Sequence, residues 1–217
     1  FAGSGALFRR AALQSVGGFA VETITEDVHT GMRIHGTGWK SLYYNRDLAA
    51  GMAQESFADV IKQRLRWARG MTQIYCLENP MFARGLNIAQ RLCYFTGIWY
   101  FFHGLPRLIF MVAPLFFLLF GYKTVNSGFV EVLIYYLPSF LATTLGYTII
   151  SRGVRHSFWS EVYETSFCIY LSLTTFLTFL SPKRAKFRVT PKGGLTEKLN
   201  FNWRIVFPQV MIAALTI

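Results

Sequence analysis

The sequence predicts an α/β fold for residues 1–90 and an α-helical membrane region for residues 91–217. The first part mixes polar and apolar side chains as a water-soluble domain does, whereas residues 92–122 and 129–150 are long apolar tracts. The whole chain is 53% hydrophobic and has a mean hydropathy of +0.32. Soluble domains are nearer 45–50% apolar, so a lipid environment explains the excess.

The polar part contains signals for several short elements. Residues 1–10 suggest the end of a strand and a glycine turn that leads into a short helix. A helix is expected from Thr25 to about residue 35, with Thr25 as its N-cap and Gly36 and Gly38 after its end. Residues 39–44 alternate in polarity as a strand does.

The next helix is expected from Ser56 to about Leu77. Ser56 is suited to cap it, and Asp59 stands three residues later, as in a capping box. Gln63, Arg66 and Trp67 are spaced i, i+3 and i+4 along this helix. Residues with that spacing share one helical face.

The apolar part contains two predicted spans, because about 20 apolar residues suffice to cross a bilayer. The first covers about residues 92–122, either as one long span with a bend near Pro106 or as an interfacial turn that leads into a span. The second covers residues 129–150. Basic residues flank the pair on both sides, including Arg91 and Arg152. The positive-inside rule therefore places both flanks in the cytosol and the loop 123–128 outside.

Residues 160–180 are long enough to span but contain Glu161, Glu164 and many hydroxyl groups. If they spanned, the basic run 183–188 would lie outside, against the charge rule. We therefore expect an amphipathic helix in the cytosolic interface, although a spanning helix is the alternative. A loop over about 183–198 and a third span over 201–217 follow.

The charge and the cysteines restrict the class of protein. The net charge of +11 favours cytosolic membrane flanks and a phosphate-bearing substrate over nucleic-acid binding. Cys76, Cys93 and Cys168 are odd in number and far apart. They predict neither a disulfide framework nor a zinc site.

Three short motifs contain the candidate chemistry. In the first, Thr25-Glu26-Asp27, an acid in the first turn of a helix is often only a partner of the free N–H groups. The alternative is that Asp27 is a general base that takes the proton of an attacking hydroxyl group.

The second motif is Gln63, Arg66 and Trp67. A solvated basic helix face is the simple alternative. However, an arginine can bind a diphosphate in bidentate fashion and stabilise its developing charge. A tryptophan offers a flat apolar face on which a sugar ring can stack.

The third motif comprises Phe187, Val189, Thr190 and Lys192, and Gly193-Gly194 follow it. A basic segment attracted to anionic lipid explains the neighbouring Lys183 and Arg184. It does not explain the Phe-x-Val-Thr-x-Lys-Gly pattern. Glycines at the end of such a segment would allow a loop to swing over a bound substrate.

In this order, with apolar tracts between the second and third motifs, the sequence resembles the cellulose synthase branch of processive, membrane-embedded family-2 glycosyltransferases. The resemblance implies the C-terminal part of a GT-A domain followed by a membrane channel region. It implies that Asp27 is the base, supported by Thr25 and Glu26. Gln63 and Arg66 would bind the nucleotide diphosphate, and Trp67 would contact the acceptor.

The same resemblance makes residues 183–198 a gating loop, in which Phe187, Val189, Thr190 and Lys192 would close over the nucleotide. Phe1-Ala2-Gly3-Ser4 is similar to a Phe-x-Gly-Ser segment, so Gly3 and Ser4 would lie beside the acceptor. The family's metal-binding Asp-x-Asp is not present. We expect the chain to be a fragment, inactive alone, with Mg²⁺ bound by residues that precede Phe1.

The resemblance implies an inverting transfer of glucose from UDP-glucose to a β-1,4-glucan, followed by export of the product. It also implies a multi-pass protein of the bacterial inner membrane whose catalytic part is cytosolic. The resemblance also implies a periplasmic export subunit and regulation by cyclic-di-GMP through a domain absent here, and no nucleic-acid partner. Alternatives are a synthase of chitin, hyaluronan, mannan or another β-glucan, a non-enzymatic transporter, and a degenerate non-catalytic subunit.

Overall fold

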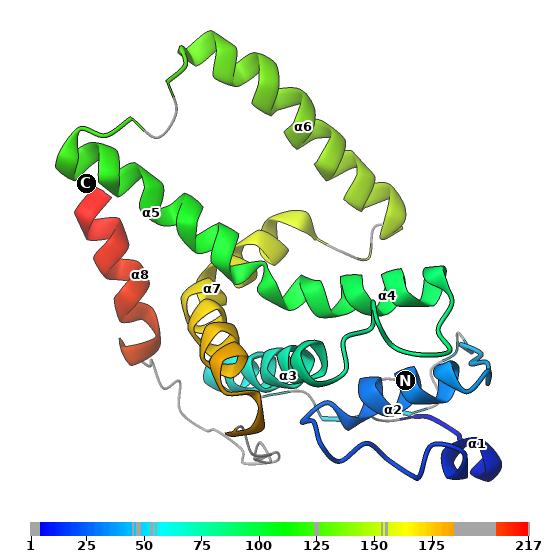
Figure 1. Cartoon of the computed structure of the whole chain (residues 1–217). Coiled ribbons are helices and arrows are strands. Elements are labelled where there is room, and N and C mark those ends of the chain that lie inside the picture. The colour runs from blue at the N-terminus through cyan, green and yellow to red at the C-terminus, as the bar shows by residue number, and fades with distance from the viewer. Residues whose placement is uncertain are drawn as a thin grey trace. The chain divides into compact units, whose positions relative to one another are not determined.

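The structure of the protein is a computed structural model that describes residues 5–44, 46, 49–52, 54, 56–123, 126–152, 154, 156–184 and 203–216. The chain divides into two compact units. Unit 1 comprises Phe1–His103 and Tyr170–Phe201, and unit 2 comprises Gly104–Ile169 and Asn202–Ile217. The elements of both units are helices, which Figure 1 labels in chain order.

Unit 1 begins with α1 (Arg10–Gln14) and α2 (Glu26–Gly36), and α3 (Phe57–Leu77) and α4 (Ile88–Trp99) follow. Two 3-10 turns belong to it, η1 (Tyr100–Phe102) and η2 (Pro182–Arg184). The bounds of α2 and α3 confirm the two helices that the sequence predicts. Ser56 caps α3 by accepting a hydrogen bond from the N–H of Asp59, which confirms the expected N-cap. The Asp59 carboxylate accepts from the Ser56 hydroxyl at 2.6 Å.

The core of unit 1 lies between α2, α3 and α4. Its buried members are apolar side chains from these helices and from the loop before α4: Met32, Met71, Ile74, Leu86 and Ile98. Tyr75 of α3 extends this core toward the last turns of the helix α7 (Ser157–Leu180), where its ring centroid lies 6.4 Å from that of Phe179. The core therefore fixes α2 against α3, and these two helices carry the first two motifs.

The backbone of the loop before α4 lies close to the backbone of α2. Gly85 has a φ of +79°, and a Cβ at this position would lie 1.8 Å from the carbonyl oxygen of Gly36. Only glycine combines this backbone conformation with the space available. Residues 84–85 are thereby held directly against the C-terminal end of α2.

The strand predicted for residues 39–44 is wrong. These residues are described and have no regular secondary structure, and no strand occurs within the described part of the chain. Leu42 and Tyr43 are 93% and 86% exposed. A strand needs a neighbour to pair its backbone groups, and alternation of polarity alone supplies none. The structure is therefore helical where it is described, and the expected α/β fold is not confirmed.

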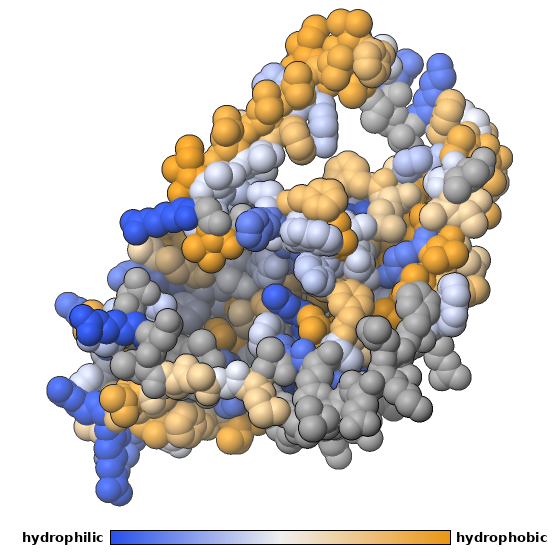
Figure 2. All heavy atoms as spheres, turned by 180° about the vertical axis from the view of Figure 1, so that it is seen from behind, coloured by the Kyte–Doolittle hydropathy of each residue, from blue (hydrophilic) through white to orange (hydrophobic). Residues whose placement is uncertain are grey.

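Unit 2 contains α5 (Gly104–Phe120), α6 (Phe129–Ile150), the first half of α7 and α8 (Trp203–Thr216). Figure 2 shows hydrophobic side chains along α6, which has no buried residue. By length and composition two described stretches could cross a membrane, Ile88–Phe120 and Phe129–Ile150. They overlap the two expected spans, and the 3-10 turn η1 interrupts the first shortly before Pro106.

Arg107 provides the principal polar contact within unit 2. Its guanidinium donates hydrogen bonds to the carboxylates of Glu161 and Glu164 and, at 3.0 Å, to the hydroxyl of Thr165. This cluster joins α5 to the first half of α7. The two acids that made residues 160–180 ambiguous in the sequence thus have a cationic partner, and the position of α7 relative to a membrane stays a prediction.

Candidate functional site

Asp27 lies in the first turn of α2, where the sequence places it. Its carboxylate is partly exposed, and Oδ1 accepts a hydrogen bond from the N–H of Val28 at 2.9 Å. None of the ion pairs between described residues involves Asp27. A partly exposed carboxylate that forms no ion pair with another described residue is accessible to a substrate, as a general base requires.

Thr25 occupies the N-cap position, but its side chain does not cap the helix. The hydroxyl instead contacts Sδ of Met71 at 4.0 Å, and the residue is only 6% exposed. The predicted capping role is therefore wrong, because packing against α3 takes the side chain away from the helix end. Its role is to attach the first turn of α2 to α3.

Gly70 makes this attachment possible. A Cβ on Gly70 would lie 2.5 Å from Oγ1 of Thr25 and 2.7 Å from its backbone nitrogen. The glycine thus allows the backbone before Asp27 to approach α3 closely. The sequence analysis missed Gly70, although a glycine inside a helix often marks a position of close packing.

Gln73 forms a second attachment one turn further along α3. Its Oε1 accepts a hydrogen bond from the N–H of Ile24 at 2.9 Å. Its Nε2 donates to the carbonyl oxygen of Pro182 at 2.8 Å. Gln73 is 2% exposed. No local pattern indicated its role, because both partners are remote in the sequence.

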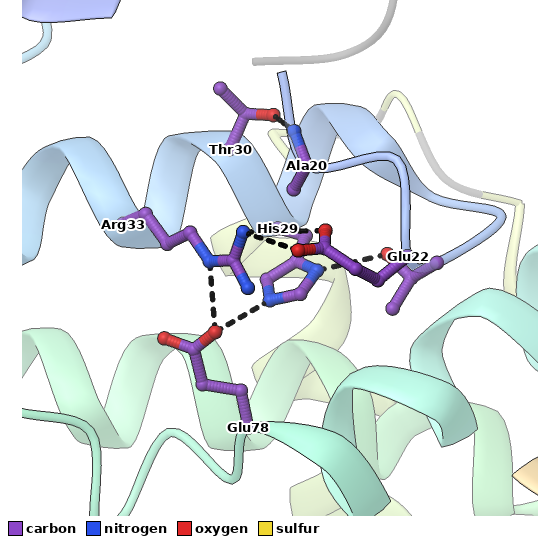
Figure 3. A network of polar contacts seen from close by, with 7 residues as sticks. Ala20, Glu22, His29, Thr30, Arg33 and Glu78 are labelled. Carbon is purple, nitrogen blue, oxygen red and sulfur yellow. Dashed lines mark hydrogen bonds and ion pairs between the residues drawn. The ribbon is translucent and has the colours of Figure 1, made fainter. Parts of the chain in front are cut away.

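A network of polar side chains also holds α2 in place (Figure 3). The buried His29 lies between Thr23, whose Oγ1 is 3.1 Å from Nδ1, and Glu78, whose Oε2 is 2.8 Å from Nε2. Arg33 donates from Nε to the same oxygen of Glu78 at 2.9 Å and from one NH group to Glu22. The network therefore connects the loop before Asp27, α2 and the residue that follows α3.

The ionisation of the two acids follows from these contacts. Burial raises the pKa of Glu78, but the hydrogen bonds from His29 and Arg33 outweigh it and hold the pKa below its usual range. A backbone hydrogen bond, with Arg33 as a weaker contributor, lowers the pKa of Glu22. Both carboxylates are thus stabilised in their charged form, which favours a structural role for this network.

Gln63, Arg66 and Trp67 lie on α3 and are partly exposed. Because α3 is continuous, they share one face as predicted. The guanidinium carbon of Arg64 lies over the Trp67 ring, 5.3 Å from its centroid. The two side chains thus form a cation–π contact.

Gly70 follows Arg66 and Trp67 by one helical turn, which is about 5.4 Å. Since Thr25 packs on Gly70, the structure brings the first two motifs together on one stretch of α3. The first turn of α2, which contains Asp27, is therefore attached to α3 about one helical turn from Arg66 and Trp67.

Glu26 is an exposed residue in the first turn of α2. The structure does not describe the other predicted site residues. Gly3, Ser4, Phe187, Val189, Thr190 and Lys192 lie outside the described residues. In the part of the chain that is described, no three His, Cys, Asp or Glu side chains gather as a metal ion would need.

Comparison with known proteins identifies the family of the chain. The cellulose synthase family model matches residues 3–169. The chain is 43% identical over 215 residues to the UDP-forming cellulose synthase catalytic subunit of Komagataeibacter sucrofermentans, covering 99% of this chain and 28% of that protein. It is 41% identical over 217 residues to the catalytic subunit of the same name from Pseudomonas fluorescens, covering 100% and 29%.

It is also 44% identical over 212 residues to cellulose synthase 1 of Komagataeibacter xylinus, covering 98% of this chain and 14% of that protein. The chain thus spans less than a third of the length of these relatives. Because the family model matches most of its residues, the chain belongs to the cellulose synthase family.

Proposed function

We propose that this chain is the acceptor side of the catalytic domain, with part of the membrane region, of a UDP-forming cellulose synthase. The enzyme transfers glucose from UDP-glucose to the non-reducing end of a β-1,4-glucan. The observation that supports this most directly is the position of Asp27, whose helix is attached to α3 one turn from Arg66 and Trp67.

In the proposed reaction, the hydroxyl at the end of the glucan attacks the anomeric carbon of the donor. Asp27 takes the proton of that hydroxyl, and a new glycosidic bond forms as the bond between the anomeric carbon and the diphosphate breaks. Attack from the side opposite the leaving group inverts the anomeric configuration. UDP departs with the bonding electrons.

The other motif residues position the two substrates. Arg66 and Gln63 bind the diphosphate, where an arginine stabilises the charge that develops on the leaving group. Trp67 provides an apolar platform for the terminal sugar of the glucan. Gly3 and Ser4 lie beside the acceptor, and Phe187, Val189, Thr190 and Lys192 belong to the loop that closes over the nucleotide.

The two long apolar helices support a membrane location. We place the enzyme in the bacterial inner membrane as a multi-pass protein, with residues 1–90 on the cytosolic side and a glucan path through the spans. Mg²⁺ is bound by parts of the enzyme other than these residues. A periplasmic export subunit and control by cyclic-di-GMP remain expectations from the family.

The test is incorporation of labelled glucose from UDP-glucose by membranes that contain the full-length synthase with this chain. Asp27→Asn should reduce incorporation by about 10²- to 10⁴-fold, the usual contribution of a general base, and should leave UDP binding unchanged. Digestion of the product by a β-1,4-glucanase identifies the linkage.

Glu131→Gln is the matched control, because it removes one negative charge from α6 and keeps a side chain that can serve in the same capping box. It should retain wild-type incorporation. An Asp27→Asn enzyme with wild-type turnover would refute the base assignment. Incorporation only from a UDP-N-acetylhexosamine or GDP-mannose would retain the mechanism but change the donor, and no incorporation from any donor would favour a transporter or a non-catalytic subunit.

A further inference from the structure

Gln73 is a buried residue of unit 1 whose contacts the proposed mechanism does not use. It is 2% exposed and lies in the middle of α3. A buried amide is costly unless both its carbonyl and its NH₂ group have partners. Both do: the oxygen accepts from Ile24 N–H at 2.9 Å, and the nitrogen donates to the Pro182 carbonyl at 2.8 Å.

The two partners belong to segments far from Gln73 in the sequence. Ile24 is 49 positions before it, and Pro182 is 109 positions after it. Ile24 directly precedes Thr25-Glu26-Asp27. Pro182 is the first residue of η2, the turn at which the described chain ends before the third motif. One amide therefore contacts the segments that lead to the base and to the proposed gating loop.

The contact with Ile24 is one of two contacts that hold the segment before Asp27 on α3. Thr25 packs on Gly70, and Gly70 and Gln73 occupy successive positions on the same face of α3. With Ile24 and Thr25 both fixed on α3, the first turn of α2 has little freedom to move. Asp27 is in that turn, so its position is set by α3.

The same face of α3 also carries Arg66, seven residues before Gln73 and so two turns away. Helix α3, which is proposed to bind the diphosphate, thus positions the base through the Oε1 atom of Gln73, which contacts Ile24. Through the Nε2 atom of Gln73, which contacts Pro182, it also positions the start of the segment that leads to Thr190.

We propose that Gln73 is a positioning residue of the transfer reaction, which sets Asp27 against the acceptor and fixes the start of the gating loop relative to α3. The inference rests on the function proposed above. It assigns to one side chain a mechanical link between the base and the loop, in addition to the stability that any buried hydrogen bond supplies.

Two substitutions separate the two ends of the link. Gln73→Glu keeps an acceptor for Ile24 N–H, but its carboxylate cannot donate to Pro182. We expect the KM for UDP-glucose to rise about tenfold, the effect of leaving the partly buried Pro182 carbonyl without its donor, with kcat close to wild type. Gln73→Met removes both contacts, and we expect kcat to fall as well, by up to about 10²-fold if the base moves by about 1 Å.

A pH series provides a readout that a purely structural role would not change. Burial raises the pKa of a carboxyl group, so mild acidification should protonate the introduced carboxyl and restore a donor to Pro182. The KM of Gln73→Glu should then approach the wild-type value at the same pH, whereas that of Gln73→Met should not recover. Gln14→Met and Gln14→Glu, at an exposed position of α1, are the matched controls and should behave as wild type throughout.

All rates are expressed per UDP-binding site in membranes with the full-length synthase, so that a loss of folded protein is not counted as a loss of catalysis. Wild-type kcat and KM per site in both Gln73 variants would overturn the inference while the proposed function stands. A KM of Gln73→Glu that does not respond to pH would overturn the link to the loop. A wild-type protein without transfer activity would instead overturn the proposed function, and this inference with it.

Discussion

Replacement of Gly70 by alanine tests the attachment of α2 to α3 with the smallest possible perturbation. The added methyl carbon would lie 2.5 Å from Oγ1, 2.6 Å from Cγ2 and 2.7 Å from the backbone nitrogen of Thr25. The two side-chain atoms can turn away by a change of rotamer. The backbone nitrogen can move only if the start of α2 moves with it.

The size of that movement follows from the contact distances. Ordinary van der Waals contact begins at 3.4 Å, so the nitrogen of Thr25 must retreat by about 0.7 Å. Overpacking of this kind costs about 1–3 kcal/mol, and alanine returns about 1 kcal/mol through its better helix propensity. The free energy of unfolding should therefore fall by only about 0–2 kcal/mol.

The effect on catalysis should be larger than the effect on stability. Asp27 is two residues from Thr25 and moves with it. Because a misplacement of about 1 Å can cost on the order of 10²-fold in rate, a shift near 0.7 Å should lower kcat by roughly 10- to 50-fold. The assay is incorporation of glucose from UDP-glucose at saturating donor, together with UDP binding and the thermal unfolding midpoint of the same preparation.

Gly97→Ala is the matched control, because Gly97 is also inside a helix of unit 1 and a Cβ there would meet nothing within 4 Å. It should gain helix propensity without losing activity. Wild-type kcat in Gly70→Ala would refute the reasoning. So would a loss of kcat that only parallels a loss of UDP-binding protein.

Three further predictions concern stability, measured as thermal or denaturant unfolding in detergent. The pKa of Glu78 is lowered, so its contacts stabilise the folded state above the ordinary glutamate pKa of about 4.3 and are lost as the pH falls through the lower folded-state value. The unfolding midpoint of wild type should therefore drop more steeply on acidification in that range than that of Glu78→Gln, and equal slopes would contradict this. Gly85→Ala should destabilise by at least about 2 kcal/mol, because a Cβ would lie 1.8 Å from a carbonyl oxygen. Gly38→Ala, with a similar positive φ and nothing within 4 Å, should cost less, and an equal cost would exclude the clash as the cause. Arg107→Leu should cost about 3 kcal/mol by leaving Glu164 without its cation; removing the acid as well should recover part of this, and no recovery would show that the pair is not coupled.

The helices of unit 1 could be predicted because their signals are local. Ser56 caps α3 through its neighbour Asp59, and α2 ends at Gly36, one residue beyond the expected end and before Gly38. The three residues of the second motif share a face because helix geometry alone requires it. Each of these inferences depends on residues within a few positions of one another.

The contacts that fix the site could not be predicted in this way. Thr25 was expected to cap its own helix, but it packs on Gly70 instead. Gln73 is bonded to residues 49 and 109 positions away, and no local pattern specifies such partners. The expected strand failed for the related reason that alternation in residues 39–44 says nothing about whether another segment pairs with them.

The exposed surface of α6 determines which amino-acid substitutions this helix can tolerate. None of its residues is buried by other described parts of this chain, so within this chain no neighbouring side chain constrains their shape. Exchange of one apolar residue for another of different shape should be nearly neutral there, whereas a charge near its middle would cost about 2.5–3.5 kcal/mol in lipid. Selection on α6 would thus act on its average hydrophobicity and hardly on the order of its residues, while in α3 a single added methyl group matters.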